Sequence, residues 1–341
     1  MISEQKLKEK LESLGLPKYR SSQILHAVCK EGKDSYLSMS NLSADLQEKL
    51  QNEIPILSIK PIHIGKTKNG ETSKALFETT DGSKIESVLM HFKDGRNSVC
   101  VSSQVGCQLG CKFCATGTMK FGRNLTAEEI ADQVLFLEQE LIRNKQHVTN
   151  VIYMGMGEPF MNFDQVIESI YILNQKNGLN IGARNITVST SGICENIEKL
   201  ADFKLQVNLA VSLHAPTQEL RAKIMPIAGK YSLNQLMDAI DHYIQKTNRR
   251  VSYEYVMLKG INDGPEQAKQ LANLIKEQLC HVNLIPYNAT GIEGISGSDK
   301  KTIENFRNIL DLNKINVTVR VTLGQEISAA CGQLANKSIK S

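Results

Sequence analysis

The sequence predicts an α/β protein built on a parallel sheet with helices packed on its outside. From residue 95 onward, six alternating strand and helix segments are followed by one further strand. Polar residues repeatedly follow the apolar strands directly, as in proteins whose sites lie at the carboxyl ends of parallel strands. The strand candidates are residues 98–103, 149–154, 185–190, 206–213, 251–257, 281–287 and 316–321.

The first part of the chain has a different texture. Apolar residues at helical spacing, beginning with Leu7 and ending with Leu50, predict short helices over residues 1–50. Residues 55–92 have a pattern typical of β-strands, and Asp81-Gly82 is typical of the turn of a hairpin. We therefore predict a small α+β accessory domain over 1–94, an α/β domain over 95–323 and a C-terminal segment over 324–341. An open sheet and a curved partial barrel would give the same pattern.

Three helices of the α/β domain have recognisable starts. Thr126 and Glu129 form a capping box ahead of an amphipathic run, and Ser232 and Gln235 form a second one. Pro265 suits the first turn of a later helix. These signals support helices between the strands.

Three cysteines follow the first strand of this domain, in a C-x3-C-x2-C pattern that can face one point on a tight loop. A cubane iron–sulfur cluster normally takes four cysteine ligands, so Cys107, Cys111 and Cys114 would leave one iron open for chemistry. Phe113, beside these ligands, would help to shield a cluster from solvent. Zinc is one alternative, although no second pair of Cys or His ligands has regular spacing, and unrelated cysteines are another.

The segment Gly155–Pro159 follows the strand at 149–154 directly. Glycine and proline by themselves mark a turn that ends a strand. Glycines also allow a backbone to approach a ligand closely, and Glu158 at a strand end could bind a cationic amine. A dinucleotide-binding fingerprint fails here because the third glycine is missing.

Polar residues end three further strands, at Ser189–Gly192, at Ser212–His214 and at Asn288. Each of them alone fits a cap or a turn. In succession on one parallel sheet, however, they would converge on a single mouth.

Two cysteines outside the cluster motif have notable surroundings. Cys100 lies between two valines on a strand, so its side chain points to the opposite face from theirs. Cys331 has small neighbours, Ala330 and Gly332, that would leave its thiol accessible. Three others resemble ordinary structural thiols, namely Cys29, Cys194 and Cys280.

Composition limits the class of protein. A chain of 341 residues with 41% hydrophobic content can bury a sizeable core. The net charge of +4 permits nucleic-acid binding without demanding it. The N-terminus lacks the apolar run of a signal peptide, and no segment approaches the ~20 apolar residues of a membrane span. We therefore expect a cytoplasmic, reducing location without membrane association.

Together, these segments resemble the radical S-adenosylmethionine (SAM) superfamily, whose cluster motif is C-x3-C-x2-C. More narrowly, the chain resembles the RlmN/Cfr family of RNA adenosine methyltransferases. This resemblance implies a partial (β/α)6 barrel and an N-terminal domain that helps to grip folded RNA. The stretches that carry it, in family order, are Cys100–Cys107, Phe113–Gly117, Met154–Pro159, Ser189–Gly192, Ser212–Pro216, Ile285–Asn288 and Ala329–Leu334.

The resemblance also implies a mechanism with a [4Fe–4S] cluster on Cys107, Cys111 and Cys114 and two SAM molecules per turnover. One SAM would methylate Cys331, and reductive cleavage of the other would give a 5′-deoxyadenosyl radical that takes hydrogen from the new methyl group. The resulting carbon radical would add to adenine, and Cys100 would resolve the adduct. The cycle would leave a Cys100–Cys331 disulfide, which must be reduced again.

Further roles follow from the same resemblance. Glu86 matches a candidate proton acceptor, although it also fits a carboxylate on a strand surface. Pro159 favours methylation of adenine C2 over C8. The segment Arg320–Gly324 is less basic than its counterpart in the family. The implied SAM contacts are Gly157, Glu158, Ser189, Ser212, Leu213, His214 and Asn288.

The expected partners are 23S rRNA and tRNA as substrates, and flavodoxin or ferredoxin as electron donor, with the protein acting as a monomer. The alternative enzyme methylates C8 of the same rRNA adenosine and confers antibiotic resistance. The alternative from another class is a non-catalytic iron–sulfur protein that binds RNA.

Overall fold

One mixed sheet organises the molecule. The computed structural model describes residues 3–335, within which ten strands lie across the sheet in the order of the sequence. The first four strands pair antiparallel, and from β4 to β10 all pairs are parallel. The strands are β1 (Ile59–Lys66), β2 (Thr72–Thr79), β3 (Lys84–His91), β4 (Asn97–Cys100), β5 (Asn150–Tyr153), β6 (Ile186–Thr190), β7 (Asn208–Ser212), β8 (Val251–Met257), β9 (Cys280–Pro286) and β10 (Val317–Val319).

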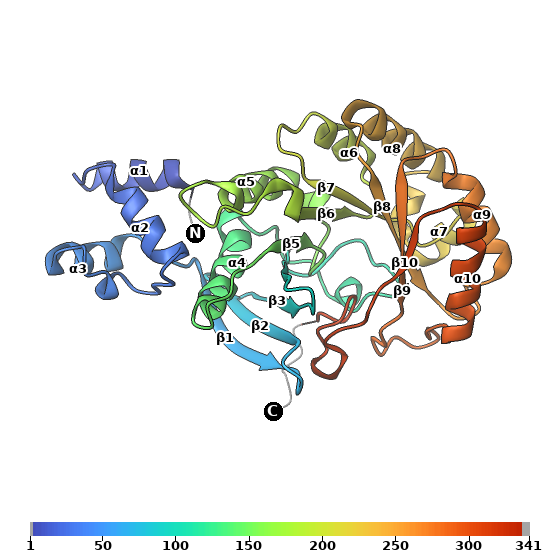
Figure 1. Ribbon diagram of the computed structural model, residues 1–341, viewed down its shortest axis with the longest axis horizontal. Coiled ribbons are helices and arrows are strands. Elements are labelled where there is room, and N and C mark those ends of the chain that lie inside the picture. The colour runs from blue at the N-terminus through green and yellow to red at the C-terminus, as the bar shows by residue number, and fades with distance from the viewer. Residues whose placement is uncertain (1–2, 336–341) are drawn as a thin grey trace.

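Helices connect the parallel strands and cover the outside of the sheet. Figure 1 shows α5, α6, α8, α9 and α10 arranged around the curved strands. The predicted α/β class and partial barrel are therefore confirmed. The connecting helices are α4 (Ala127–Ile142), α5 (Phe163–Asn174), α6 (Cys194–Ala201), α7 (Gln218–Ile224), α8 (Leu233–Thr247), α9 (Pro265–Ile275) and α10 (Lys300–Leu312).

The local signals lie where the sequence predicts them. Both capping boxes are formed, with the Thr126 hydroxyl accepting from the Glu129 amide and the Ser232 hydroxyl from the Gln235 amide. Such a cap stabilises a helix by about 1 kcal/mol. Pro265 opens α9. β4 ends three residues earlier than predicted, because the chain leaves the sheet after Cys100 to form the cysteine loop.

The N-terminal helices α1 (Glu4–Ser13), α2 (Arg20–Cys29) and α3 (Ala44–Glu53) lie at one end of the molecule (Figure 1). The strands β1 to β3 extend the same sheet as the barrel strands. The predicted boundary near residue 94 therefore stays a prediction, because the β3–β4 pairing carries the sheet across it. Residues 336–341 of the predicted C-terminal segment lie outside the described residues.

Side chains alternate between the two faces of the barrel strands. In β8, Tyr253 and Tyr255 are buried in the core, whereas Ser252, Glu254 and Val256 line cavities of the barrel. This period of two is what a strand with an apolar outer face and a polar inner face requires. The inner face thus carries the candidate site. Within residues 3–335, no helix is long and apolar enough to cross a membrane.

Candidate active site

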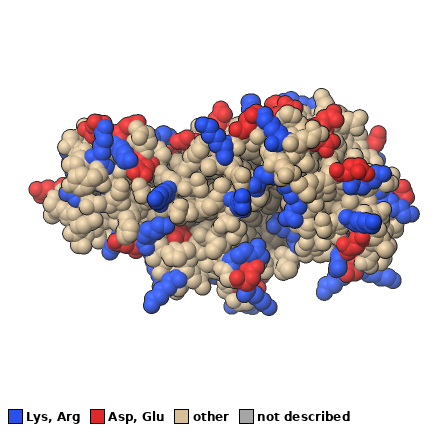
Figure 2. Space-filling model, turned by 45° about the horizontal axis from the view of Figure 1, so that its top comes forward, with Lys and Arg blue, Asp and Glu red and all other residues tan. Residues whose placement is uncertain are grey.

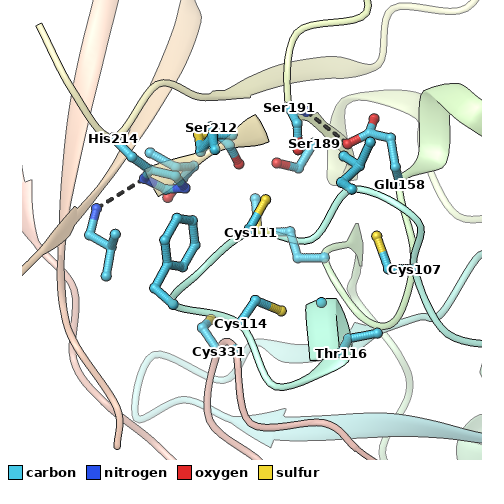
Figure 3. Close-up of a pocket in the computed structure, with 18 of the residues that line it drawn as sticks. Cys107, Cys111, Cys114, Thr116, Glu158, Ser189, Ser191, Ser212, His214 and Cys331 are labelled. Atoms are coloured by element: carbon cyan, nitrogen blue, oxygen red, sulfur yellow. Dashed lines mark hydrogen bonds between the residues drawn. The ribbon is translucent and has the colours of Figure 1, made fainter. Parts of the chain in front are cut away.

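The three clustered cysteines lie on the loop after β4, and their side chains border one cavity at the carboxyl end of the barrel. Figure 3 shows Cys107, Cys111 and Cys114 around a common space. The loop is fixed to the barrel where the Lys112 amide donates a 3.0 Å hydrogen bond to the Ile224 carbonyl. The fold therefore brings these three thiols together.

Three thiols that border one cavity suit a cubane cluster. Among residues 3–335, no three Cys, His, Asp or Glu side chains are placed to hold one metal ion. A mononuclear zinc site needs ligands that meet at one point, whereas a cubane spreads its ligand sulfurs over different iron atoms. Burial raises the pKa of Cys107 to about 12 and also raises that of Cys111, so metal binding must displace their protons.

An aromatic pair closes one side of the cavity. The rings of Phe113 and His214 meet edge to face, with centroids 4.7 Å apart. Burial lowers the pKa of His214 to about 3, so the imidazole is neutral at physiological pH. Its Nδ1 accepts a 3.1 Å hydrogen bond from the Val256 amide, so Nε2 carries the proton and is available as a donor.

Polar and small residues at the strand ends form another wall. The side chain of Leu213 is fully buried in the core, so any contact from this residue would come from its backbone. The other predicted SAM contacts border the cavity, namely Gly157, Glu158, Ser189, Ser212, His214 and Asn288.

Glu158 is a buried carboxylate held in place by backbone amides. Its Oε2 accepts a 2.8 Å hydrogen bond from the Ser191 amide, and its Oε1 accepts one of 3.1 Å from the Phe160 amide. Burial raises the pKa of Glu158, and these hydrogen bonds oppose that shift. A carboxylate offers about four acceptor positions, so Glu158 could also receive an ammonium group. Gly157 has a φ of +98°, and a Cβ there would lie 2.5 Å from the Cβ of Gln104.

Arg221, in α7, is a site residue that sequence reasoning missed. Its side chain is fully buried, and its Nη2 donates hydrogen bonds to the carbonyls of Ser191 (2.6 Å) and Ser212 (3.4 Å). Its Nε and Nη1 are buried without a hydrogen-bond partner among the described residues. Burial lowers its pKa to about 10, so it remains charged at neutral pH, close enough to Cys111 and Glu158 for mutual electrostatic effects.

The C-terminal segment brings Cys331 to the same cavity. Figure 3 shows Cys331 beside Cys114, and Cys331 is an exposed residue that borders the cavity. Two hydrogen bonds fix the segment to the cysteine loop: the Ala115 amide donates to the Gly332 carbonyl (2.7 Å), and the Thr116 hydroxyl to the Leu334 carbonyl (2.6 Å). The predicted accessibility of this thiol agrees with its position.

Cys100 approaches this segment from the sheet. Val99 and Val101 lie in the main core, whereas Cys100 packs with Ala329 and Leu334 in a separate cluster on the other face. Burial raises the pKa of Cys100 to about 12, and the charge of Cys331 adds to that effect. Sequence alternation therefore gave the correct face for Cys100.

Glu86 is deeply buried, so it is not a carboxylate on a strand surface. Its Oε1 pairs with Lys74 Nζ at 2.9 Å, and both side chains are almost completely buried. Its Oε2 accepts a 3.0 Å hydrogen bond from the Ala335 amide, and Lys74 Nζ also donates to the Ser328 carbonyl at 3.3 Å. Glu86 does not border the cavity of the cysteines. These contacts favour a role in holding the C-terminal segment, and its predicted role as proton acceptor stays a prediction.

Glu254, in the middle of β8, is the other site residue that was missed. It borders the cavity, accepts a 2.8 Å hydrogen bond from Asn283 and lies 3.5 Å from Arg320 Nη1. Burial raises its pKa, and the charge of Arg320 opposes that shift. A single acidic residue on the polar face of an otherwise apolar strand was the available signal.

Comparison with known proteins places this site in a family context. The family model of the radical SAM superfamily matches residues 101–274, which include the cysteine loop and strands β5 to β8. A second model, for the N-terminal domain of ribosomal RNA large subunit methyltransferases, matches residues 2–56.

Full-length relatives agree with both matches. The chain is 46% identical to a probable dual-specificity RNA methyltransferase RlmN of Bacillus pumilus, covering 97% of this chain and 91% of that protein. A protein of the same name from Lachnospira eligens is 44% identical, over 96% of this chain and 92% of its own. The crystal structure of a radical SAM methyltransferase from Sphaerobacter thermophilus superposes with a TM-score of 0.95 at 43% identity, covering 98% of this chain and 97% of that one.

Proposed function

The chain belongs to the radical SAM superfamily and, within it, to the RlmN family of RNA methyltransferases, and we propose that it methylates C2 of adenosine. The proposed substrates are adenosine 2503 of 23S rRNA and adenosine 37 of tRNA, in keeping with the dual-specificity name of the relatives. The observation that carries this proposal is the convergence of Cys107, Cys111, Cys114 and Cys331 on one cavity, with Cys100 packed against the segment that carries Cys331.

A [4Fe–4S] cluster and SAM are the cofactors of this enzyme. We propose that Cys107, Cys111 and Cys114 hold the cluster and that Glu158 binds the SAM ammonium group. When bound, these cofactors supply the methyl group and the 5′-deoxyadenosyl radical. His214 would donate through Nε2 to the cofactor, and the buried charge of Arg221 would offset the negative charge of the thiolates.

The two remaining thiols divide the transfer chemistry. Adenine C2 is not a nucleophile, so the methyl group has to pass through the protein. The methyl group on the Cys331 sulfur would lose one hydrogen atom to the radical that the cofactors supply, and its carbon would then bond to adenine C2. After the C2 proton has left, Cys100, once deprotonated, would attack the Cys331 sulfur, so that the bond between this sulfur and the carbon breaks as the disulfide forms. The carbon stays on the RNA as a methyl group after taking up a proton, and one electron is released. The packing of Cys100 with Ala329, two residues before Cys331, supports this division. Small thiols in a reducing compartment such as the cytoplasm would reduce the Cys100–Cys331 disulfide and so restore both thiols for the next turnover.

The experiment that tests the proposal is product analysis. Anaerobically reconstituted protein is incubated with SAM, dithionite or a flavodoxin, and 23S rRNA fragments or tRNA. Digestion and mass spectrometry should then give 2-methyladenosine. Release of 8-methyladenosine alone would overturn the C2 assignment. Failure to form 5′-deoxyadenosine would overturn the radical mechanism.

A further inference from the structure

The barrel contains a second cavity on the amino-terminal side of the first one. The same inward-facing rows line both cavities: in β6, Thr187 borders the second cavity and Ser189 the first. In β8, Ser252 borders the second cavity and Val256 the first. Met154 and Glu254 border both, so the two cavities adjoin at the middle of the barrel.

The two cavities differ sharply in charge. No Lys or Arg borders the first one within the described residues, whereas four arginines border the second. Arg184 and the pair Arg249 and Arg250 lie on the chain just before β6 and β8, at the amino ends of the strands. Arg320 lies deeper, beside Glu254. We call these four residues the arginine mouth. Figure 2 shows Lys and Arg side chains gathered around a hollow in the middle of one face.

The positive charge of the mouth is largely uncompensated. Within residues 3–335, Arg184, Arg249 and Arg250 make no ion pair with a carboxylate. Arg184 donates to the neutral amide of Gln206, and Arg249 to that of Asn208. Arg249 Nε is buried without a hydrogen-bond partner among the described residues. Guanidinium groups that have no carboxylate in an ion pair are suited to bind phosphate groups, which they can contact in a bidentate manner.

The arginine mouth also lies on the side of the barrel from which Cys100 and Cys331 could be reached. Arg320 Nη1 lies 3.8 Å from the sulfur of Met154, and Met154 packs against the cluster of residues that contains Cys100, so this arginine connects the mouth to the surroundings of that thiol. About 650 Å³ of the second cavity is open to the centres of water molecules, a size typical of ligand sites. A base in folded RNA cannot reach a buried thiol unless its nucleotide is extruded from the stack.

We propose that the arginine mouth binds the phosphates flanking the target adenosine and admits the extruded base from the amino-terminal side of the barrel. This inference rests on the proposed RNA methylation and adds the route by which RNA enters. Cofactors and substrate would then approach the thiols from opposite ends of one barrel. The ligand is an RNA segment in which the modified nucleotide is unpaired or can be flipped out.

The test measures RNA binding by the cluster-loaded full-length protein. A fluorescein-labelled hairpin with the target adenosine in its loop is titrated at several salt concentrations, with Arg184→Gln, Arg250→Gln and the double variant. Both arginines are exposed, so each substitution should weaken binding by up to about 5-fold at low salt. Each should also reduce the slope of log K against log salt by about 0.7, as expected for the loss of one contact to a single strand.

The matched control is Arg143→Gln, which removes an exposed arginine near the end of α4, away from both cavities. Its RNA affinity and salt slope should equal those of the wild type. Equal affinity and slope for the double variant and the wild type would overturn the proposal. So would variants that bind RNA normally but lose activity only when flavodoxin replaces dithionite, because the mouth would then serve the electron donor.

Two further measurements distinguish a failure of the proposed entry route from a failure of the proposed RNA methylation. SAM affinity and the absorption of the cluster should be unchanged in the mouth variants, because neither arginine borders the first cavity. If wild-type protein methylated no RNA, the proposed function would fail. If it methylated RNA while the double variant bound RNA as tightly, only the entry route would fail.

Discussion

The side chain of Asn288 donates a 3.1 Å hydrogen bond from Nδ2 to the backbone carbonyl of Cys331. This contact joins the end of β9 to the segment that carries the reactive thiol. Asn288 is held in turn by Gln325, whose Nε2 donates to its Oδ1 at 2.9 Å. Asn288 therefore both borders the cavity and holds the backbone of the cysteine that we propose to accept the methyl group.

Asn288→Ala should slow the methylation of Cys331. A typical net hydrogen bond contributes about 0.5–1.5 kcal/mol, which corresponds to a rate about 2- to 12-fold lower. Mass spectrometry of the Cys331 peptide after a single turnover measures this rate, and equilibrium dialysis measures SAM affinity separately. Gln325→Ala loosens Asn288 without touching the cavity, and it should slow methylation while leaving SAM affinity unchanged. A normal rate in both variants would contradict the positioning role.

Cys100→Ala should trap the protein on its RNA. Without the resolving thiol, the link between the Cys331 sulfur and the adenine carbon has no nearby nucleophile to break it. Denaturing gels after nuclease digestion should show a protein carrying a nucleotide, and peptide mapping should place it on Cys331. Cys280→Ala, which removes a buried thiol that borders neither cavity, should turn over normally. Normal turnover by Cys100→Ala would exclude Cys100 from the mechanism.

Lys74→Met should destabilise the fold and loosen the C-terminal segment. It removes the Lys74 ammonium from its ion pair with the buried Glu86 carboxylate, and breaking a buried ion pair costs about 3–5 kcal/mol. Urea unfolding measures the loss, and the rate of Cys331 alkylation reports on the segment. The double variant Lys74→Met/Glu86→Leu removes both charges and should recover most of the stability. Lost activity with unchanged alkylation would favour the proton-acceptor role for Glu86 instead.

His214 should make stability depend on pH. Its pKa is about 3 in the folded protein because of burial, against an ordinary value of about 6.5. Between these values the unfolded chain binds a proton that the folded protein does not, so stability is present above about pH 6.5 and is lost as pH falls. The loss approaches about 1.4 kcal/mol per pH unit. His214→Asn should lack this component, so the stability gap between variant and wild type should narrow from pH 7 to pH 5. A constant gap would mean that His214 is not buried in neutral form.

Arg221→Gln should lower the reduction potential of the bound cluster. The buried positive charge near Cys111 favours the more negative, reduced state of a cluster, and glutamine removes that charge while keeping hydrogen-bond capacity. A redox titration followed by electron paramagnetic resonance measures the shift. Lys223→Gln removes an exposed charge from the same helix and should leave the potential unchanged. An unchanged or raised potential in Arg221→Gln would contradict the electrostatic role.

Local patterns predicted much of the fold. The capping boxes at Thr126 and Ser232 and the proline at 265 depend on neighbours within one turn, so the sequence displays them directly. The curvature of the sheet and the joining of β1–β3 to the barrel depend on contacts between distant segments. A strand pattern does not encode those contacts, so open sheet and barrel could not be separated by periodicity.

For the candidate site too, local patterns were predictable and contacts between distant segments were not. The spacing of Cys107, Cys111 and Cys114 and the alternation around Cys100 are visible in one stretch of sequence. Arg221 was not identifiable, because its buried side chain bonds to the carbonyls of Ser191, just after β6, and Ser212, the last residue of β7. The environment of Glu86 likewise depends on Lys74 and on a backbone amide 249 residues away.

The order of the strands has a consequence for how the molecule is made. Because sequence order equals spatial order from β1 to β10, each strand can add to the edge of a sheet already formed by the residues before it. Folding during synthesis proceeds from the N-terminal end. Cys331 is therefore the last of the reactive thiols to emerge, and it docks onto a cysteine loop whose surrounding barrel is already in place. Vectorial synthesis thus separates in time the three thiols proposed to hold the cluster from the one proposed to carry the methyl group.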